Sequence, residues 1–314
     1  MNKYSITHSL FLLVSLFWLA NSCAYAIDWQ RLPGQKITLF YPGQSSWEWL
    51  LTEHEGASEI KSGKFCRECH ADIQQEMGQK LISGAFLEPK PIAGKASSVE
   101  IEIKSTYDAE NLYLHLAWTA TPQAGANEYP DYEAMASLML DDGRVPEIAR
   151  GGCWGACHAD VNGMPNADRA SNISKYLVKS RSKMTRYGGG NHIKSSADLQ
   201  NLLDSGFFAE IWQARLNRGQ DANVSQGYIL ARRHDHTKSQ VRASARYDSG
   251  RWFVELSRPL IINEPGYKDI MPGKTYTVGF AVHDGHVKGR RHYVSLAYTL
   301  RLDEGPADFI ARKQ

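Results

Sequence analysis

Val99–Trp118, with the sequence VEIEIKSTYDAENLYLHLAW, decides the class of fold in this chain. Its first part alternates valine and isoleucine with charged residues, and its second part alternates leucine with tyrosine and histidine. Because side chains alternate between the two faces of a β-strand, each part presents one apolar face. The polar residues Asp108–Asn111 between the two parts indicate a turn, so the stretch predicts a β-hairpin with one buried face.

Further strand patterns follow this hairpin in the chain. Among them, Ser196 can cap a helix from Asp198 to about Asn217, which Gly206 weakens or splits. Several antiparallel strands with one helical insertion predict a mainly β chain built as an antiparallel β-sandwich. The predicted strands are Ala136–Leu140, Val241–Tyr247, Trp252–Arg258, Thr275–His283 and Arg291–Leu302.

The part of the chain before the hairpin has a different pattern. Ile27–Ser46 contains two Pro-Gly pairs and is predicted to be a linker. A short amphipathic helix is predicted from Ser46 to about Ser58, and another helix from Asp72 to about Ile82. The predicted organisation is a signal peptide at residues 1–26, a small helical segment at 27–94 and the β-sandwich at 95–314.

The N-terminus has the features of an export signal. Lys3 supplies a positive start, and Leu10–Ala20 is an apolar run too short to span a bilayer. Ala24-Tyr25-Ala26 is a small-x-small cleavage site, so the mature chain is expected to begin at Ile27 and to reside in the periplasm. A lipoprotein cleaved before Cys23 is the alternative, although the two preceding residues suit that cleavage poorly.

Two short motifs place a histidine directly after a pair of cysteines. In c-type haem attachment the cysteine sulfurs add to the vinyl groups of haem, and the adjacent histidine ligates the iron. The first motif has the usual two residues between its cysteines, and the second has three. The motifs predict two covalent c-type haems, held by the sulfurs of Cys66, Cys69, Cys153 and Cys157, with His70 and His158 as proximal iron ligands.

Other roles for paired cysteines are zinc binding, a redox dithiol and disulfides. Zinc knuckles usually join two such pairs about 15–20 residues apart, whereas these pairs lie far apart in sequence, although folding could unite them. A redox dithiol does not require the histidine. Once the signal peptide is removed, every cysteine belongs to one of the two motifs, which suits an oxidising compartment with no spare cysteine.

The second axial ligand of each iron decides the function, because an iron with one protein ligand is reactive and an iron with two mainly passes electrons. For the first haem we favour His54, which continues the helical face of Trp47, Leu50 and Leu51. The simpler alternative is a histidine that merely packs at the edge of that face. Met77 is the local alternative ligand, although a methionine on an amphipathic helix more often packs in a core.

For the second haem the candidates lie near the end of the chain. His292 alternates with Val294 and Leu296, so it is expected to point to the apolar side of its strand. A buried histidine on such a face is usually a satisfied core residue, and only its relation to a cofactor motif makes it a candidate. His283 is the second candidate for this distal position.

From about Ser97 to its end the chain resembles the haem-binding domain of the ethylbenzene dehydrogenase γ-subunit type. The stretches that carry this resemblance are Val99–Trp118, Ala136–Arg144 (ASLMLDDGR) and Val278–Ser295 (VGFAVHDGHVKGRRHYVS). The resemblance implies a β-sandwich that holds one haem between its sheets. It also implies an electron-transfer subunit of molybdenum enzymes, or a domain fused to multihaem quinol-oxidising cytochromes.

The chain departs from that family in its iron ligands. Members with non-covalent haem use a Met and a Lys as axial ligands. Here the Met region is replaced by Cys153–His158, and the Lys position carries His292, with His283 as runner-up, so the resemblance implies bis-histidine ligation. The first motif lies outside the shared domain and resembles the N-terminal haem segment of exported c-type relatives.

These features lead to one main hypothesis and two alternatives. The main hypothesis is a periplasmic dihaem c-type cytochrome that transfers electrons between a membrane quinol-oxidising or other cytochrome and a terminal oxidoreductase such as a molybdenum enzyme. The first alternative is an enzyme that reduces a small oxidant at one open iron, with Pro165–Ser195 as a lid. The second is a haem-containing ligand-binding or sensor β-sandwich. We favour an electron carrier over an enzyme, because no residue marks a general acid. A net charge of +2 gives no sign of a nucleic-acid partner.

Overall fold

The computed structural model describes residues 27–83, 87–88, 92–122, 131–158, 175–186, 188–287 and 291–314. The predicted signal peptide and Cys23 lie outside these residues. Within the described ranges no helix is long and apolar enough to cross a membrane. The strands are β1 (Gln35–Phe40), β2 (Ser98–Tyr107), β3 (Asn111–Thr119), β4 (Ala134–Asp141), β5 (Ala209–Leu216), β6 (Asn223–Ile229), β7 (Arg233–Asp235), β8 (Arg242–Asp248), β9 (Arg251–Pro259), β10 (Thr275–Asp284), β11 (Tyr293–Val294), β12 (Tyr298–Leu302) and β13 (Phe309–Lys313).

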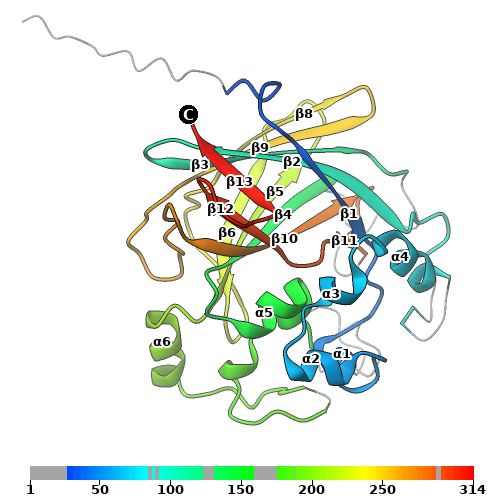
Figure 1. Ribbon diagram of the computed structural model, residues 1–314, viewed down its shortest axis with the longest axis vertical. Helices are drawn as coiled ribbons and strands as arrows, with labels where there is room; N and C mark the ends of the chain where they lie inside the picture. The colour runs from blue at the N-terminus through cyan, green and yellow to red at the C-terminus, as the bar shows by residue number, and fades with distance from the viewer. Residues whose placement is uncertain are drawn as a thin grey trace, which may run out of the picture.

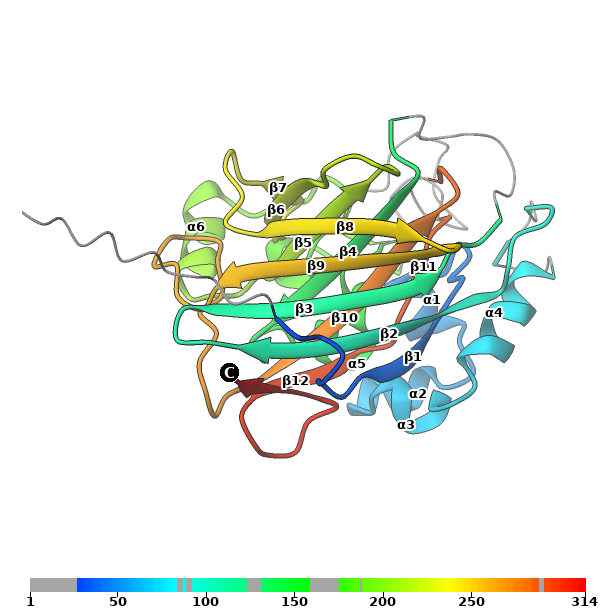
Figure 2. The same ribbon diagram turned by 90° about the horizontal axis from the view of Figure 1, so that it is seen from above.

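The strands pair into one mainly antiparallel sheet that folds over itself in two layers. Its order is β7-β6-β5-β4-β10-β11-β1-β2-β3-β9-β8. Figure 2 shows β2, β3, β9 and β8 lying across β4, β5 and β10. A second connection between the layers runs through β12 and β13, because β12 pairs with β10 and β13 pairs with β2. The mainly β, sandwich-like architecture predicted from the sequence is therefore confirmed.

The main core lies between the two layers. In the hairpin β2–β3, Ile103 pairs with Leu116, and both side chains are buried as the alternation predicts. The strands β4 and β10 bury Leu138 and Phe280 in the same core cluster. The predicted hairpin over residues 241–258 is also present, as β8 and β9. Burial of these apolar side chains, worth roughly 1.5–3 kcal/mol each, provides the main stabilisation of the sandwich.

Helices lie along one side of the sandwich (Figure 1). The helix at Pro146–Gly151 and the 3₁₀ turn at Gly152–Ala156 lie on the outer face of the layer that contains β4 and β10, where Met139, Ile148 and Ala156 belong to a second, smaller core. This covering explains why nearly every residue of β4 is buried rather than every second one. The helix at Gln74–Ile82 packs against β1 and β2. The helices are α1 (Trp47–Thr52), α2 (Ala57–Ser62), α3 (Cys66–His70), α4 (Gln74–Ile82), α5 (Pro146–Gly151) and α6 (Ser196–Asp204), with 3₁₀ turns η1 (Gly152–Ala156) and η2 (Val178–Ser180).

A buried ion pair joins the two layers inside the sandwich. Glu210 of β5 and Arg258 of β9 are both fully buried, with Arg258 Nη2 3.0 Å from Glu210 Oε2 and Arg258 Nε 3.1 Å from Glu210 Oε1. The carboxylate also accepts hydrogen bonds from Trp212 Nε1 (2.6 Å), Gln226 Nε2 (2.7 Å) and the backbone N–H of Lys268 (2.6 Å). Each oxygen is thus satisfied, which a buried charge requires.

The prediction of a linker over Ile27–Ser46 is wrong. Gln35–Phe40 forms β1, which pairs antiparallel with β2 from Gln35↔Ile103 to Phe40↔Ser98. The Pro-Gly pairs that suggested a linker flank this strand. The partner strand lies more than 50 residues away in sequence, so a local pattern does not reveal the pairing.

Other predicted elements have different limits. The helix predicted over Ser46–Ser58 is two helices, α1 and α2, and α4 agrees with the helix predicted from Asp72 to Ile82. The helix predicted to reach Asn217 ends at Asp204, because Gly206 has a positive φ of 75° and the chain then enters β5. The strand predicted over Arg291–Leu302 is divided into β11 and β12.

Candidate haem sites

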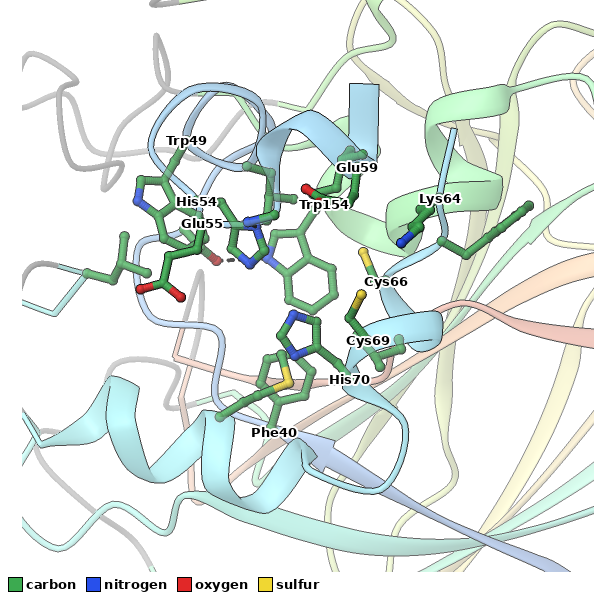
Figure 3. Close-up of a pocket in the computed structure, with 18 of the residues that line it drawn as sticks. Phe40, Trp49, His54, Glu55, Glu59, Lys64, Cys66, Cys69, His70 and Trp154 are labelled. Carbon is green, nitrogen blue, oxygen red and sulfur yellow. Dashed lines mark hydrogen bonds between the residues drawn. The ribbon is translucent and has the colours of Figure 1, made fainter. Parts of the chain in front are cut away.

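The first cysteine motif lies beside a cavity of about 530 Å³. Figure 3 shows the imidazoles of His54 and His70 and the sulfurs of Cys66 and Cys69 at this cavity. Its volume is within the range of about 300–1,000 Å³ that is typical of sites for small molecules and cofactors. Its walls are mostly apolar and include Phe40, Leu50, Ile60, Met77, Leu81, Trp154 and Leu296.

The helix α3 explains how the motif faces the cavity. Cys66, Cys69 and His70 stand at i, i+3 and i+4, which places their side chains on one face of a helix. Glu68 fixes the start of the helix, because its Oε1 accepts the backbone N–H of Phe65 at 2.8 Å. One helical turn therefore presents two sulfurs and an imidazole to the same space.

His54 approaches the cavity from the segment that follows α1. Its ring centre lies 5.7 Å from that of His70, with the ring planes at 64°. Two imidazoles bound on opposite sides of one metal ion, each by a bond of about 2 Å, have ring centres roughly 6 Å apart. The structure thus brings together the two histidines that the sequence proposed as axial ligands of the first iron, and their separation suits a shared ion.

Burial changes the pKa values of His54, His70 and Cys66 at this cavity. It lowers the pKa of both His54 and His70, and the neighbouring His54 lowers that of His70 further. Both rings are therefore neutral near pH 7, which is the form that binds a metal. Burial raises the pKa of the Cys66 thiol to about 11. The apolar environment that causes this rise suits a neutral thioether.

Two ring nitrogens at the cavity show how ligation would rearrange the site. The backbone N–H of Gly56 donates to His54 Nδ1 at 3.0 Å, so the proton of the neutral ring is on Nε2. Binding of iron at Nε2 would move that proton to Nδ1 and break the Gly56 hydrogen bond. His70 Nδ1 is buried without a hydrogen-bond partner in the described part of the chain. Two facing imidazoles beside two thiols in a mostly apolar cavity are the groups that a covalently attached haem needs, so the first site fits such a haem.

The second motif has a different environment. Cys153 lies within the 3₁₀ turn η1, and Cys157 directly follows it. Cys153 Sγ lies over Gly279 of β10, 3.8 Å from where a Cβ on that glycine would be. Burial raises the pKa of the Cys153 thiol. His158 is fully buried, and its ring stacks on that of Tyr176 with centres 3.6 Å apart and planes at 2°.

Both nitrogens of His158 contact protein acceptors. Nδ1 contacts a carboxylate oxygen of Glu48, and Nε2 lies 3.0 Å from the backbone carbonyl oxygen of Tyr176. The Tyr176 carbonyl oxygen can only accept, so Nε2 carries the proton that it donates there, and both ring nitrogens are engaged by protein atoms. An iron bound at Nε2 would take the place of that proton, and the Tyr176 carbonyl would have to move. In the arrangement described, His158 does not present a ligand.

The two candidate distal histidines of the second site lie against each other. The rings of His283 and His292 are stacked with centres 4.5 Å apart and planes at 16°. His283 shares the outer face of β10 with Gly279, four residues away, and so with the contact made by Cys153. The described residues assemble no group of three His, Cys, Asp or Glu side chains that could hold a metal ion by themselves. The ligand set of the second site stays a prediction.

Sequence analysis missed three residues at these sites. Glu48 contacts the proposed ligand of the second motif, while Phe40 and Trp154 form an aromatic wall of the first cavity, with ring centres 5.2 Å apart. Only Trp154 had a local signal, because it stands between the cysteines of the second motif. Met77 also lines the first cavity, so the structure leaves it as the alternative ligand there.

A family model and two curated cytochromes match most of this chain. The family model described as ethylbenzene dehydrogenase matches residues 26–241 and 220–295. The chain is 35% identical over 293 residues to cytochrome c-552 of Stutzerimonas stutzeri, covering 91% of each chain. It is 27% identical over 290 residues to cytochrome c-551 of Rhodocyclus tenuis, covering 92% of this chain and all of the relative.

Among solved structures, a family 9 carbohydrate-binding module from Caldicellulosiruptor kristjanssonii in complex with cellotriose is similar, with a TM-score of 0.29 and 9% identity. The match covers 63% of this chain and 65% of that one. A likeness at this level carries no information about function.

Proposed function

The chain belongs to the ethylbenzene dehydrogenase family, and we propose that it is a periplasmic c-type cytochrome that carries electrons between other redox proteins. The observation that carries the proposal is the arrangement at the first cavity. Two neutral imidazoles face each other across a separation suited to one metal ion, beside two thiols in an apolar cavity of about 530 Å³. Iron with two protein ligands has no open position for a substrate, which favours electron transfer over catalysis.

In this proposal the residues of the chain hold and tune the haem, which supplies one-electron chemistry when bound. Cys66 and Cys69 attach it, and His70 and His54 are the axial ligands. The apolar walls exclude water from the site, and burial of this kind is one of the determinants of a haem reduction potential. The relatives called cytochrome c-552 and cytochrome c-551 support the assignment to c-type cytochromes.

We extend the proposal to a second covalent haem at Cys153 and Cys157, with His158 as its proximal ligand. Glu48 supports this role, because a carboxylate on Nδ1 is the usual means of orienting a metal-bound histidine and leaves Nε2 as the ligating nitrogen. The distal ligand would be His292 or, failing that, His283. Attachment at this motif requires movement of the Tyr176 carbonyl away from His158 Nε2.

The proposed partners are redox proteins. A membrane quinol-oxidising cytochrome would be a suitable donor, and a terminal oxidoreductase such as a molybdenum enzyme a suitable acceptor. The matching family model is described as ethylbenzene dehydrogenase, which is an oxidoreductase. This description supports redox proteins as the partners. Export would occur through the signal peptide predicted at residues 1–26.

Replacement of His54 by alanine tests the proposed function. We expect His54→Ala to open the sixth position of the first iron, so the reduced variant binds one CO per chain more than the reduced wild type. CO titration followed by visible absorption measures this difference. His192→Ala, which changes an exposed histidine, is the matched control and should leave CO binding unchanged. Equal CO binding by His54→Ala and wild type would contradict the assignment of His54, and CO binding at the first iron of the wild type would favour an enzyme.

A further inference from the structure

Trp154 belongs to the second motif but lines the first cavity. It stands between Cys153 and Cys157 in η1, and its indole lies at the same cavity as His54 and His70 (Figure 3). The ring is 6% exposed and stacks on Phe40 with planes at 23°. Its Nε1–H donates to Ser45 Oγ at 2.8 Å. One side chain is thus fixed to the second motif by the backbone and to the first site by its ring.

The helix α1 makes a second connection between the motifs. The backbone N–H of Trp47 donates to the carbonyl oxygen of Cys157 at 2.7 Å, and Glu48 contacts His158 Nδ1. On its other side the helix lines the first cavity, where the ring of Trp49 meets that of His54 edge-on, with centres 5.2 Å apart. The position of His54 therefore depends on contacts that α1 makes with the second motif.

The second motif packs closely against the elements around it. A Cβ at Gly155 would lie 2.6 Å from the carbonyl oxygen of Glu147, so η1 packs closely on the backbone of α5. A Cβ at Gly151 would lie 2.8 Å from the ring of Trp47, so α1 in turn packs closely on the end of α5. Ile148 of α5 is fully buried in the smaller core. These contacts run from the sandwich through the second motif to the wall of the first cavity.

We propose that Trp154 is a positioning residue for the first iron site, and that with α1 it holds His54 in place as the sixth ligand. The state of the first haem then depends on the second motif, although the two motifs are more than 80 residues apart in sequence. This inference rests on the proposed function, because it assumes a haem at Cys66 and Cys69. Trp154 acts through His54 and the cavity wall, without itself binding the iron.

Trp154→Leu in the full-length, matured protein tests this role. Loss of the stacked ring and its hydrogen bond should weaken the hold on His54, so CO should displace this ligand more easily. We expect the CO concentration that half-saturates the first haem of the reduced protein to fall about tenfold, which is the scale expected from losing an aromatic pair. We also expect a shift in the reduction potential of that haem. Trp252→Leu is the matched control, since Trp252 is buried in β9 and belongs to neither motif; it should leave both values unchanged.

A double variant shows which of the two irons the Trp154 substitution affects. His54→Ala alone should bind one extra CO per chain, and His54→Ala with Trp154→Leu should bind the same amount, because both changes act on one ligand. Two extra CO per chain would mean that Trp154 acts on the second iron, and would overturn the proposal. Trp154→Phe, which keeps a ring on Phe40, should fall between wild type and Trp154→Leu, and it replaces Trp154→Leu if that variant does not accumulate.

Haem content separates the two possible failures. Wild type without covalent haem at Cys66 and Cys69 would overturn the proposed function. Full haem content with CO binding and potential unchanged in both Trp154 variants would contradict only the role of Trp154.

Discussion

We expect the replacement of both Cys66 and Cys69 by serine to remove one covalent haem per chain and to leave the sandwich folded. Serine cannot form the thioether bonds, and a haem without them is held only by its axial ligands. The fold should persist because the main core lies between the two layers of strands. Helix α3 buries none of its residues, so it is not needed for that core. The intact mass should fall by one haem, and far-ultraviolet circular dichroism should keep its β-sheet form.

The matched variant changes the other motif in the same way. We expect Cys153→Ser with Cys157→Ser to lose the other haem, because that motif is proposed to hold the second one. An unchanged mass in the first variant, after allowance for the two substitutions, would mean that Cys66 and Cys69 carry no haem. An unchanged mass in the second variant would restrict the proposal to the first motif, where the geometry described fits a haem as it stands.

Glu210→Gln should lower the free energy of unfolding by about 3–5 kcal/mol, the usual cost of removing one partner of a buried ion pair. The substitution keeps the shape of the side chain but leaves the Arg258 guanidinium as an uncompensated buried charge. This loss is a large part of the roughly 5–15 kcal/mol that stabilises a typical domain. Denaturant unfolding followed by tryptophan fluorescence measures it, with Trp212 next to the substituted residue.

A control and a second variant define the source of that loss. Glu255→Gln changes an exposed carboxylate on β9, and it should alter stability by less than about 0.5 kcal/mol. Glu210→Gln combined with Arg258→Met should cost less than the sum of the single changes, because the unpaired charge is then absent. Additive losses in the double variant would contradict an ion pair as the source of the effect.

The sequence predicted those parts of the fold in which the paired segments are neighbours in the chain, and it missed pairings between distant segments. The hairpin β2–β3 was predictable because its two strands are neighbours in sequence and their alternation places Ile103 and Leu116 on one buried face. Strand β1 was not, because its partner is distant and glycine and proline flank it. In β5 the buried positions include Glu210, a charge that the alternation of apolar residues cannot anticipate.

The candidate sites divide in the same way. The first motif follows from a local rule, the spacing of its cysteines and histidine, and the structure brings His54 to the same cavity. The helical spacing that suggested His54 was not the reason, because α1 ends at Thr52 and His54 lies in the segment after it. The contacts of Glu48 with His158 and of Ser45 with Trp154 join residues more than 100 positions apart. Neither has a signature in the sequence, because each arises only when α1 packs against the second motif.

The most direct test of the central claim is a peptide map of the wild-type protein, matured in a periplasm that attaches c-type haem. We predict that the peptide containing Cys66 and Cys69 carries one haem, and that the peptide containing Cys153 and Cys157 carries another. Pyridine haemochrome on the same sample should give two haems per chain. Unmodified thiols at Cys66 and Cys69 would contradict the claim, and the four cysteines would then have to be explained as zinc ligands or disulfides.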